Sequence, residues 1–168
     1  LYAEQLALEV GLADDPYDEL GILQSELFRA NRLVVDTGMH YKKWTKEKAM
    51  DYMKSVTGMS DTEVRVEIER YIVWPGQALS YKVGMIKILE LREKAIKALG
   101  QRFDLKDFHS AVLDHGNPPL FIVEDMVDEM IFEAGKEKDI LLKGIFGGSF
   151  GPWLRQKFIE FFSTNNSY

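Results

Sequence analysis

Four polar side chains recur at a spacing that would place them along one side of a helix. They are Arg29, Arg32, Asp36 and His40, separated by three, four and four residues. Residues three and four apart are neighbours on a helix surface. Two interpretations of this stripe stay open. It is either a solvated face with a local Arg–Asp pair, or a polar row inside a mostly buried helix, where charges must be paired and tend to line a cleft.

A second polar group follows a break in an apolar run, in the segment YIVWPGQALSYKVG at residues 71–84. Proline is favoured at the first position of a helix, so we expect a helix to begin at Pro75. Gln77, Tyr81 and Gly84 then fall on one side of that helix, close to Lys82. The segment is either an ordinary helix-to-helix corner with Tyr81 as a core aromatic, or part of a functional site.

Few residues are suited to bind a catalytic metal. The only histidines are His40, His109 and His115, no two of them form a His-x-x-x-His pair, and there is no cysteine. A catalytic zinc site needs three protein ligands and an open position for water. We therefore expect no metal site and no cofactor in this chain.

The elements that would position these residues are all predicted to be helices. Apolar residues recur with a period near 3.6 and no segment alternates with a period of two, which predicts an all-α bundle or array. We expect helices over 1–11, 16–40, 45–58, 60–74, 75–100, about 104–115 and about 119–135.

Capping signals support several of these boundaries. Thr45 is an expected N-cap, Gly58 an expected stop, and Ser60 with Glu63 has the spacing of a capping box. On the second helix five residues have the spacing of a core-facing stripe: Leu20, Leu23, Leu27, Ala30 and Val34.

The composition limits the classes of function. The chain has 168 residues, of which 46% are hydrophobic and 29% charged, and its net charge is −6. This balance suits one globular body and gives no bias toward nucleic-acid phosphates, so we expect no nucleic-acid partner. The first residues, LYAEQLALEVGL, have the pattern of a helix interior, which suggests a fragment of something longer.

The last segment differs in character from residues 1–143. Residues 144–168 contain a Gly-Gly-Ser run followed by an amphipathic stretch with an aromatic stripe, formed by Phe150, Trp153, Leu154, Phe158, Phe161 and Phe162. Such a tail either docks on its own body or binds a protein partner or a membrane surface.

Several blocks of the sequence carry a resemblance. The segments DDPYDELGILQSELFRANRLVVDTGMHYKKWTKEKAMDYM, ERYIVWPGQALSYKVGMIKILELREKA and FDLKDFHSAVLDHG, with the first twelve residues, resemble the C-terminal part of the DUF885 family over about residues 1–132. Members of this family are helical and resemble zinc metallopeptidases of the gluzincin type. The resemblance implies that a His-Glu-x-x-His helix and a Glu-Gly-Trp segment with the third zinc ligand lie upstream of Leu1.

The resemblance also implies roles for the polar residues. Tyr81 is implied as the donor to the scissile carbonyl as it becomes an oxyanion, with Gln77 and Lys82 as substrate-binding neighbours. His40 is implied to orient the substrate backbone, and Arg32 and Asp36 to support it in binding the substrate.

Two functions from different classes remain open. The chain is either the substrate-side fragment of a zinc-dependent peptidase, inactive alone because the zinc and its ligands belong to the intact parent, or a non-catalytic helical module that binds a partner. The sequence immediately upstream of Leu1 would discriminate between them.

Overall fold

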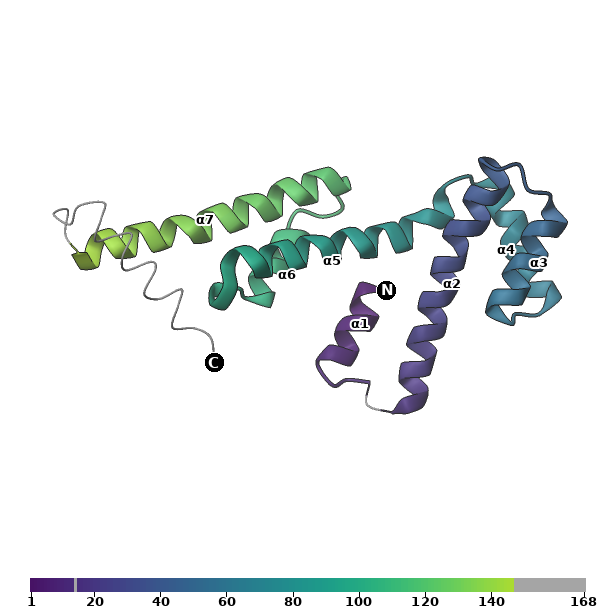
Figure 1. The fold of residues 1–168 in the computed structure, drawn as a ribbon, viewed down its shortest axis with the longest axis horizontal. Coiled ribbons are helices and arrows are strands. Elements are labelled where there is room, and N and C mark those ends of the chain that lie inside the picture. Colours follow the sequence, from purple (N-terminus) through teal and green to yellow (C-terminus); the bar gives the residue numbers. More distant parts are fainter. Residues whose placement is uncertain (14, 147–168) are drawn as a thin grey trace. The chain divides into compact units, whose positions relative to one another are not determined.

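The computed structural model describes residues 1–13 and 15–146, with side chains up to Lys136. All of the regular structure in these residues is helical, as predicted, and Figure 1 shows its order. The elements are α1 (Tyr2–Glu9), α2 (Pro16–His40), α3 (Lys46–Thr57), α4 (Asp61–Val73), η1 (Gln77–Leu79), α5 (Ser80–Leu99), η2 (Gly100–Arg102), α6 (Leu105–Leu113) and α7 (Leu120–Phe146), where η denotes a short 3-10 helix.

Local side-chain hydrogen bonds fix the ends of these helices. The Thr45 Oγ1 atom accepts from the Lys48 N–H at 3.2 Å, and Ser60 and Glu63 form the predicted capping box. At the end of α3, Gly58 has φ +68°, a left-handed conformation that glycine adopts without a steric penalty. The structure confirms these predicted boundaries. They were predictable because each capping signal acts over only three or four residues.

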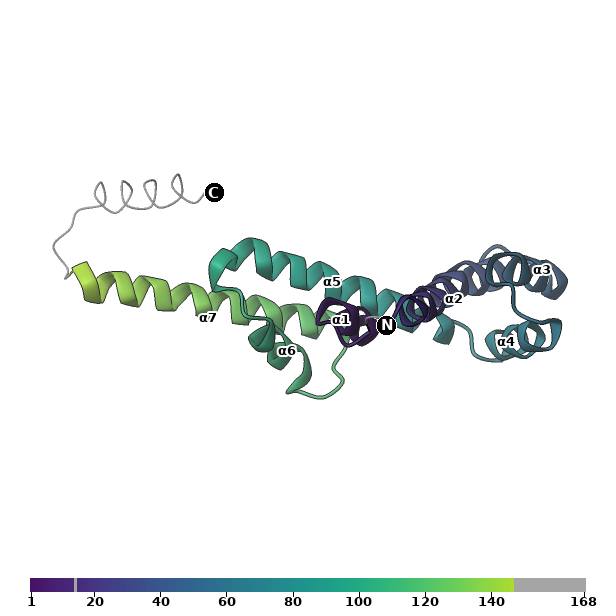
Figure 2. The same ribbon diagram turned by 90° about the horizontal axis from the view of Figure 1, so that it is seen from below.

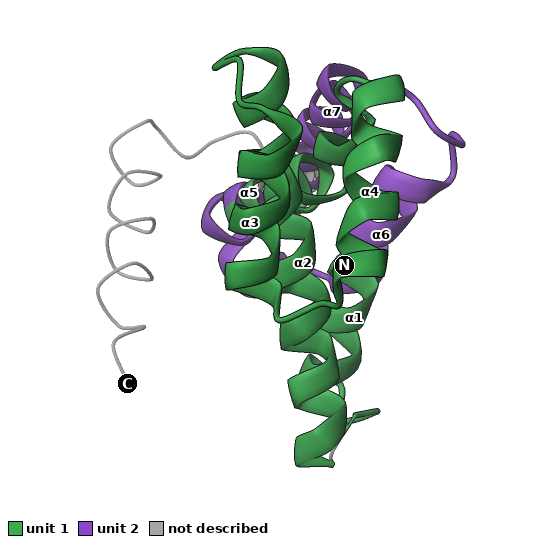
Figure 3. Ribbon diagram, turned by 90° about the vertical axis from the view of Figure 1, so that its right-hand side faces the viewer, with its two compact units in different colours: residues 1–93 green, residues 94–168 purple. Residues whose placement is uncertain are grey.

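The chain divides into two compact units, residues 1–93 and 94–168, coloured separately in Figure 3. The boundary falls within α5, and α7 continues across the expected division between residues 143 and 144. Most of the expected tail domain, residues 147–168, lies outside the described residues, so the prediction that its aromatic stripe docks or binds a partner stays a prediction.

In the first unit, α2 packs against α3, α4 and η1. Helices α3 and α4 lie side by side in both Figure 1 and Figure 2. The core between these elements is apolar and closely packed, and it consists of Val35, Met39, Ala49, Met53, Val64, Ile68, Tyr71 and Ala78. The polar stripe of α2 thus runs beside the core of this unit.

In the second unit, α6 packs against α7 (Figure 2). Its buried side chains are Ala95, Leu99, Phe108, Val123 and Val127. The Lys94 ammonium forms an ion pair with the Asp128 carboxylate at 2.5 Å, which links the end of α5 to α7. None of the described helices has a stretch long and apolar enough to cross a bilayer.

The predicted core face of α2 is wrong. Leu20, Leu23, Leu27 and Val34 are 51, 52, 46 and 38% exposed, whereas the buried residues of this helix include Arg32, Val35, Asp36 and Met39. The side of α2 that the neighbouring helices cover is set by contacts with α3, α4 and η1, which the periodicity of α2 alone does not reveal.

The predicted helix start at Pro75 is also wrong. Trp74, Pro75 and Gly76 form a turn, Gly76 adopts φ +83°, and the α-helix begins only at Ser80 after the short η1. A residue with positive φ cannot continue an α-helix, so the glycine overrides the signal from the proline.

The last described helix is longer than predicted. The predicted range ends at about residue 135, but α7 extends to Phe146. Gly135 has no positive φ and therefore forms no left-handed cap.

A close contact joins α2 to the loop before α3. A Cβ atom at Gly38 would lie 2.6 Å from the Trp44 ring, well inside van der Waals contact. Gly38 is buried, and its backbone oxygen accepts the Trp44 N–H at 2.9 Å. Any residue could adopt the helical backbone conformation of Gly38. The glycine is therefore required for packing, because a side chain would collide with the Trp44 ring.

We expect Gly38→Ala to lower the free energy of unfolding by about 1–3 kcal/mol, because the indole ring must shift out of its packed position. Gly21→Ala on the same helix is the matched control, since a Cβ there meets nothing within 4 Å. It should stabilise the protein by about 0.5–1 kcal/mol. Urea unfolding of both variants checks this, and equal effects would contradict the steric explanation.

Candidate functional site

Asp36 holds the turn that leads into η1. Its carboxylate is 2% exposed, and its two oxygens accept the Gly76 N–H at 3.2 and 3.1 Å. A buried carboxylate is costly without such donors. This contact ties α2 to a backbone position forty residues later and so fixes where Gln77 and Tyr81 begin.

Arg32, one helical turn earlier, is the centre of the site. Its side chain is 2% exposed, and the Nη2–H donates to the Gln77 Oε1 atom at 3.0 Å. The guanidinium carbon lies 4.8 Å from the centre of the Tyr81 ring and 5.3 Å from that of Tyr71. The charge is therefore stabilised by aromatic faces and one neutral amide.

A second arginine approaches the same rings. The Arg29 guanidinium carbon lies 5.4 Å from the centre of the Tyr81 ring and 4.8 Å from that of Phe28. Tyr81 itself is 48% exposed, so one part of this cluster is open to solvent. Arg29 belongs to the stripe seen in the sequence, and that stripe was the signal that could have placed it in the site.

The structure places His40 away from Arg32 along α2 and links it to the cluster through Tyr71. His40 lies eight residues beyond Arg32, about 12 Å along the helix axis. Its Nε2 atom lies 2.9 Å from the Tyr71 carbonyl oxygen. A carbonyl only accepts, so Nε2 carries the proton and donates it there.

Lys82 is engaged in an ion pair. Its ammonium binds the Glu26 carboxylate of α2. Of the six residues singled out in the sequence, the structure thus brings Arg32, Gln77 and Tyr81 into contact, places Asp36 next to them through Gly76, and gives His40 and Lys82 partners of their own.

Tyr71 supports the cluster from the core side. Its hydroxyl donates to the Glu67 Oε2 atom at 2.5 Å, and Glu67 also accepts from Arg70. Burial is the main cause that raises the pKa of the Tyr71 hydroxyl well above its ordinary value, and the hydrogen bond to Glu67 raises it further. The phenol therefore remains neutral beneath the Arg32 guanidinium.

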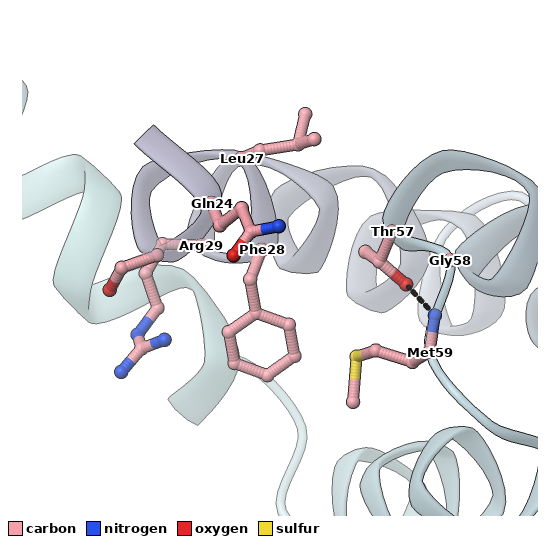
Figure 4. A pocket seen from close by; sticks show the side chains of 8 residues that line it. Gln24, Leu27, Phe28, Arg29, Thr57, Gly58 and Met59 are labelled. Carbon is pink, nitrogen blue, oxygen red and sulfur yellow. Dashed lines mark hydrogen bonds between the residues drawn. The ribbon is translucent and has the colours of Figure 1, made fainter. Parts of the chain in front are cut away.

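An open pocket of about 410 Å³ adjoins the cluster. Figure 4 shows Phe28 and Arg29 extending to the same side of α2, with Met59 facing Phe28 from the loop after α3. The Met59 N–H donates to the Thr57 Oγ1 atom at 3.3 Å, which helps to hold that loop. Phe28 and Met59 were not singled out from the sequence because the loop and α2 meet only in the folded chain.

The site offers hydrogen-bond donors and positive charge rather than metal ligands. Across residues 1–13 and 15–136, whose side chains the structure describes, no group of three or more His, Asp or Glu side chains is placed to hold a metal ion. The arrangement can bind an anionic or carbonyl-bearing ligand.

The comparisons with known proteins agree with the resemblance seen in the sequence. Residues 1–127 match the family described as "Bacterial protein of unknown function (DUF885)", and the chain belongs to this family. It is also similar to a crystal structure described as that of "the putative lipoprotein from Colwellia psychrerythraea", with 52% identity and a TM-score of 0.77. That match covers 79% of this chain but only 23% of the other one. No curated protein matches the chain.

The raised pKa of Tyr71 predicts a loss of stability in alkali. In the unfolded chain the phenol ionises near pH 10, while in the folded protein it does so only at higher pH. Its contribution is therefore fully present below about pH 10 and is lost as the pH rises toward the folded pKa. The free energy of unfolding should fall by up to about 1.4 kcal/mol per pH unit there.

Urea unfolding between pH 8 and pH 12 measures this slope. Tyr71→Phe should reduce the slope, whereas Tyr17→Phe, which changes a ring that is 82% exposed, should leave it unchanged. An unchanged slope in Tyr71→Phe would show that other groups cause the alkaline loss.

The Asp36 contact predicts a graded effect of mutation. Asp36→Ala leaves the Gly76 N–H without its acceptor and should cost about 1–3 kcal/mol of unfolding free energy. Asp36→Asn keeps one acceptor oxygen and should cost less. Thermal unfolding of the two variants checks the order, and a larger loss in Asp36→Asn would refute the role of the carboxylate as an acceptor.

Proposed function

We propose that this chain is the substrate-side part of a zinc-dependent peptidase of the DUF885 family. The match covers less than a quarter of its longer relative, which leaves room for the metal-binding segments elsewhere in such a protein. In this proposal the zinc and its ligands belong to other segments of the full-length protein, and residues of this chain bind and orient the peptide. The proposal therefore concerns substrate binding and stabilisation of charge.

The cluster of Arg32, Gln77 and Tyr81 is the observation that carries the proposal. A buried charge held by an amide and two aromatic rings contributes little to stability compared with apolar packing. The buried Arg32 guanidinium instead places a positive charge beside the half-exposed Tyr81. A hydroxyl donor next to fixed positive charge suits a carbonyl oxygen that becomes negative in the transition state.

The other implied residues have narrower roles in this proposal. His40 uses its Nε2–H on the Tyr71 carbonyl, so it would orient the substrate backbone only through Nδ1. Lys82 would act through its ion pair with Glu26, which holds the first turn of α5 against α2. Tyr81 therefore remains the first candidate for the oxyanion donor.

A non-catalytic partner-binding module is the second candidate function. The exposed apolar stripe of α2, Leu20, Leu23 and Leu27, favours it, because such a face can bind another helix. A His-Glu-x-x-His segment followed by Glu-Gly-Trp upstream in the full-length protein would favour the peptidase instead.

Mutation of Tyr81 in the full-length protein tests the main proposal. If the hydroxyl donates to the oxyanion, Tyr81→Phe should lower kcat by roughly 10²–10³ on a peptide substrate while the fold is kept. Tyr41→Phe is the control, because the Tyr41 ring is 83% exposed and not part of the cluster. An unchanged kcat in Tyr81→Phe would remove this role, and absence of metal-dependent cleavage by the unchanged protein would remove the peptidase.

A further inference from the structure

Arg29 and Arg32 lack the carboxylate partners that other partly buried cations of this unit have. Lys82, Arg70 and Arg92 are each paired with an acid, namely Glu26, Glu67 and Glu9. Among the described residues, neither Arg29 nor Arg32 forms an ion pair. Their Nε atoms are buried without a hydrogen-bond partner, as are those of Arg70 and Arg92, so the missing carboxylate is the difference. Within the part of the chain that the structure describes, the acceptor for this pair is the neutral Gln77 amide.

The charges of the cluster do not cancel. Asp36 is buried one turn beyond Arg32 and offsets one positive charge, although its oxygens bind the Gly76 N–H. The carboxylate one turn before Arg29, that of Glu26, is paired with Lys82, so it does not offset the second positive charge. Both guanidinium carbons lie within 5.8 Å of the Phe28 ring centre. The cluster therefore has an excess of one positive charge, which suits an anion with a single negative charge.

The pocket shows where such an anion would enter. Arg29 lines it together with the apolar Phe28 and Met59, and Gln24, Ser25 and Thr57 add polar surface (Figure 4). The pocket therefore offers one cationic side chain close to apolar surface. Arginine binds carboxylates through two parallel hydrogen bonds, and its planar fork fits that group in particular. A ligand with a carboxylate next to an apolar side chain matches both features.

We infer that Arg29 binds the terminal carboxylate of a peptide, with the last side chain of that peptide in the pocket between Phe28 and Met59. This inference rests on the proposed peptidase function and names its substrate class, namely peptides with a free and apolar C-terminal residue. Arg32, which is almost fully buried, is a positioning residue that holds Gln77 and strengthens the positive field at Arg29.

The position of the carboxylate also limits where the chain is cut. The Arg29 guanidinium carbon is 5.4 Å from the Tyr81 ring centre, and one extended residue spans about 3.4 Å. The carbonyl that reaches the Tyr81 hydroxyl therefore belongs to a residue close to the C-terminus. The enzyme would therefore cut near that end of the peptide.

Kinetics of the full-length protein on matched peptides test the inference. Peptides ending in a free Phe or Leu should have a KM about 10–100-fold lower than the same peptides with a C-terminal amide. Arg29→Gln should raise KM for the free acids by a similar factor, with kcat little changed, and should abolish the preference. Arg29→Lys should fall between the two, because it keeps the charge without the fork. Arg65→Gln, on the exposed side of α4, is the control and should change neither constant.

Two results would overturn the inference while the peptidase proposal stands. One is equal KM for free acids and amides. The other is tight binding of an amidated peptide whose last residue is Glu, since the bound group would then be a side-chain carboxylate.

A binding measurement separates failure of the inference from failure of the proposed function. Calorimetry on the full-length protein with N-acetyl-phenylalanine, and with its amide, needs no catalysis. Binding of the acid alone, lost in Arg29→Gln with an unchanged melting temperature, would support the carboxylate site even if no peptide is cleaved. Cleavage of peptides with no binding difference between acid and amide would refute the site and leave the peptidase in place.

Discussion

The contact between the Asp36 carboxylate and the Gly76 N–H is the constraint on which the site depends. It holds Gly76 in a left-handed conformation, and this sets the start of η1 and then of α5. The rise of that helix places Tyr81 against the arginines of α2, and Gln77 within reach of Arg32. One buried carboxylate thus brings together residues that lie about forty positions apart in the sequence.

The energetic character of this cluster differs from that of the core beside it. The core of the first unit gains stability from apolar burial, which is roughly proportional to the area removed from water. The cluster places two buried charges of opposite sign and aromatic faces at the edge of that core. Such groups contribute little net stability but strongly restrict geometry, because a misplaced donor or charge is costly. Such an arrangement is expected of a binding site, where the exact position of the side chains matters more than their contribution to stability.

How much of this was predictable from the sequence depends on the range of each interaction. The caps at Thr45 and Ser60 were predicted because side chain and backbone partner lie three residues apart. The buried face of α2 was predicted wrongly, since Leu20 and Leu23 have core spacing but are about half exposed. The prediction that a helix starts at Pro75 was wrong because the turn there depends on Asp36, which lies forty residues earlier in the chain. Contacts across long separations leave no local pattern in residue type.

The close approach of Gly38 and Trp44 has a consequence for how related chains can diverge. With no room for a Cβ at position 38, a larger residue there requires a smaller one at position 44, and the indole in turn requires the glycine. The two positions should therefore change together or not at all among relatives that keep this loop. Because the Trp44 ring also packs near Tyr52 of α3, with ring centres 5.5 Å apart, a change at position 38 would extend to the sequence of the next helix.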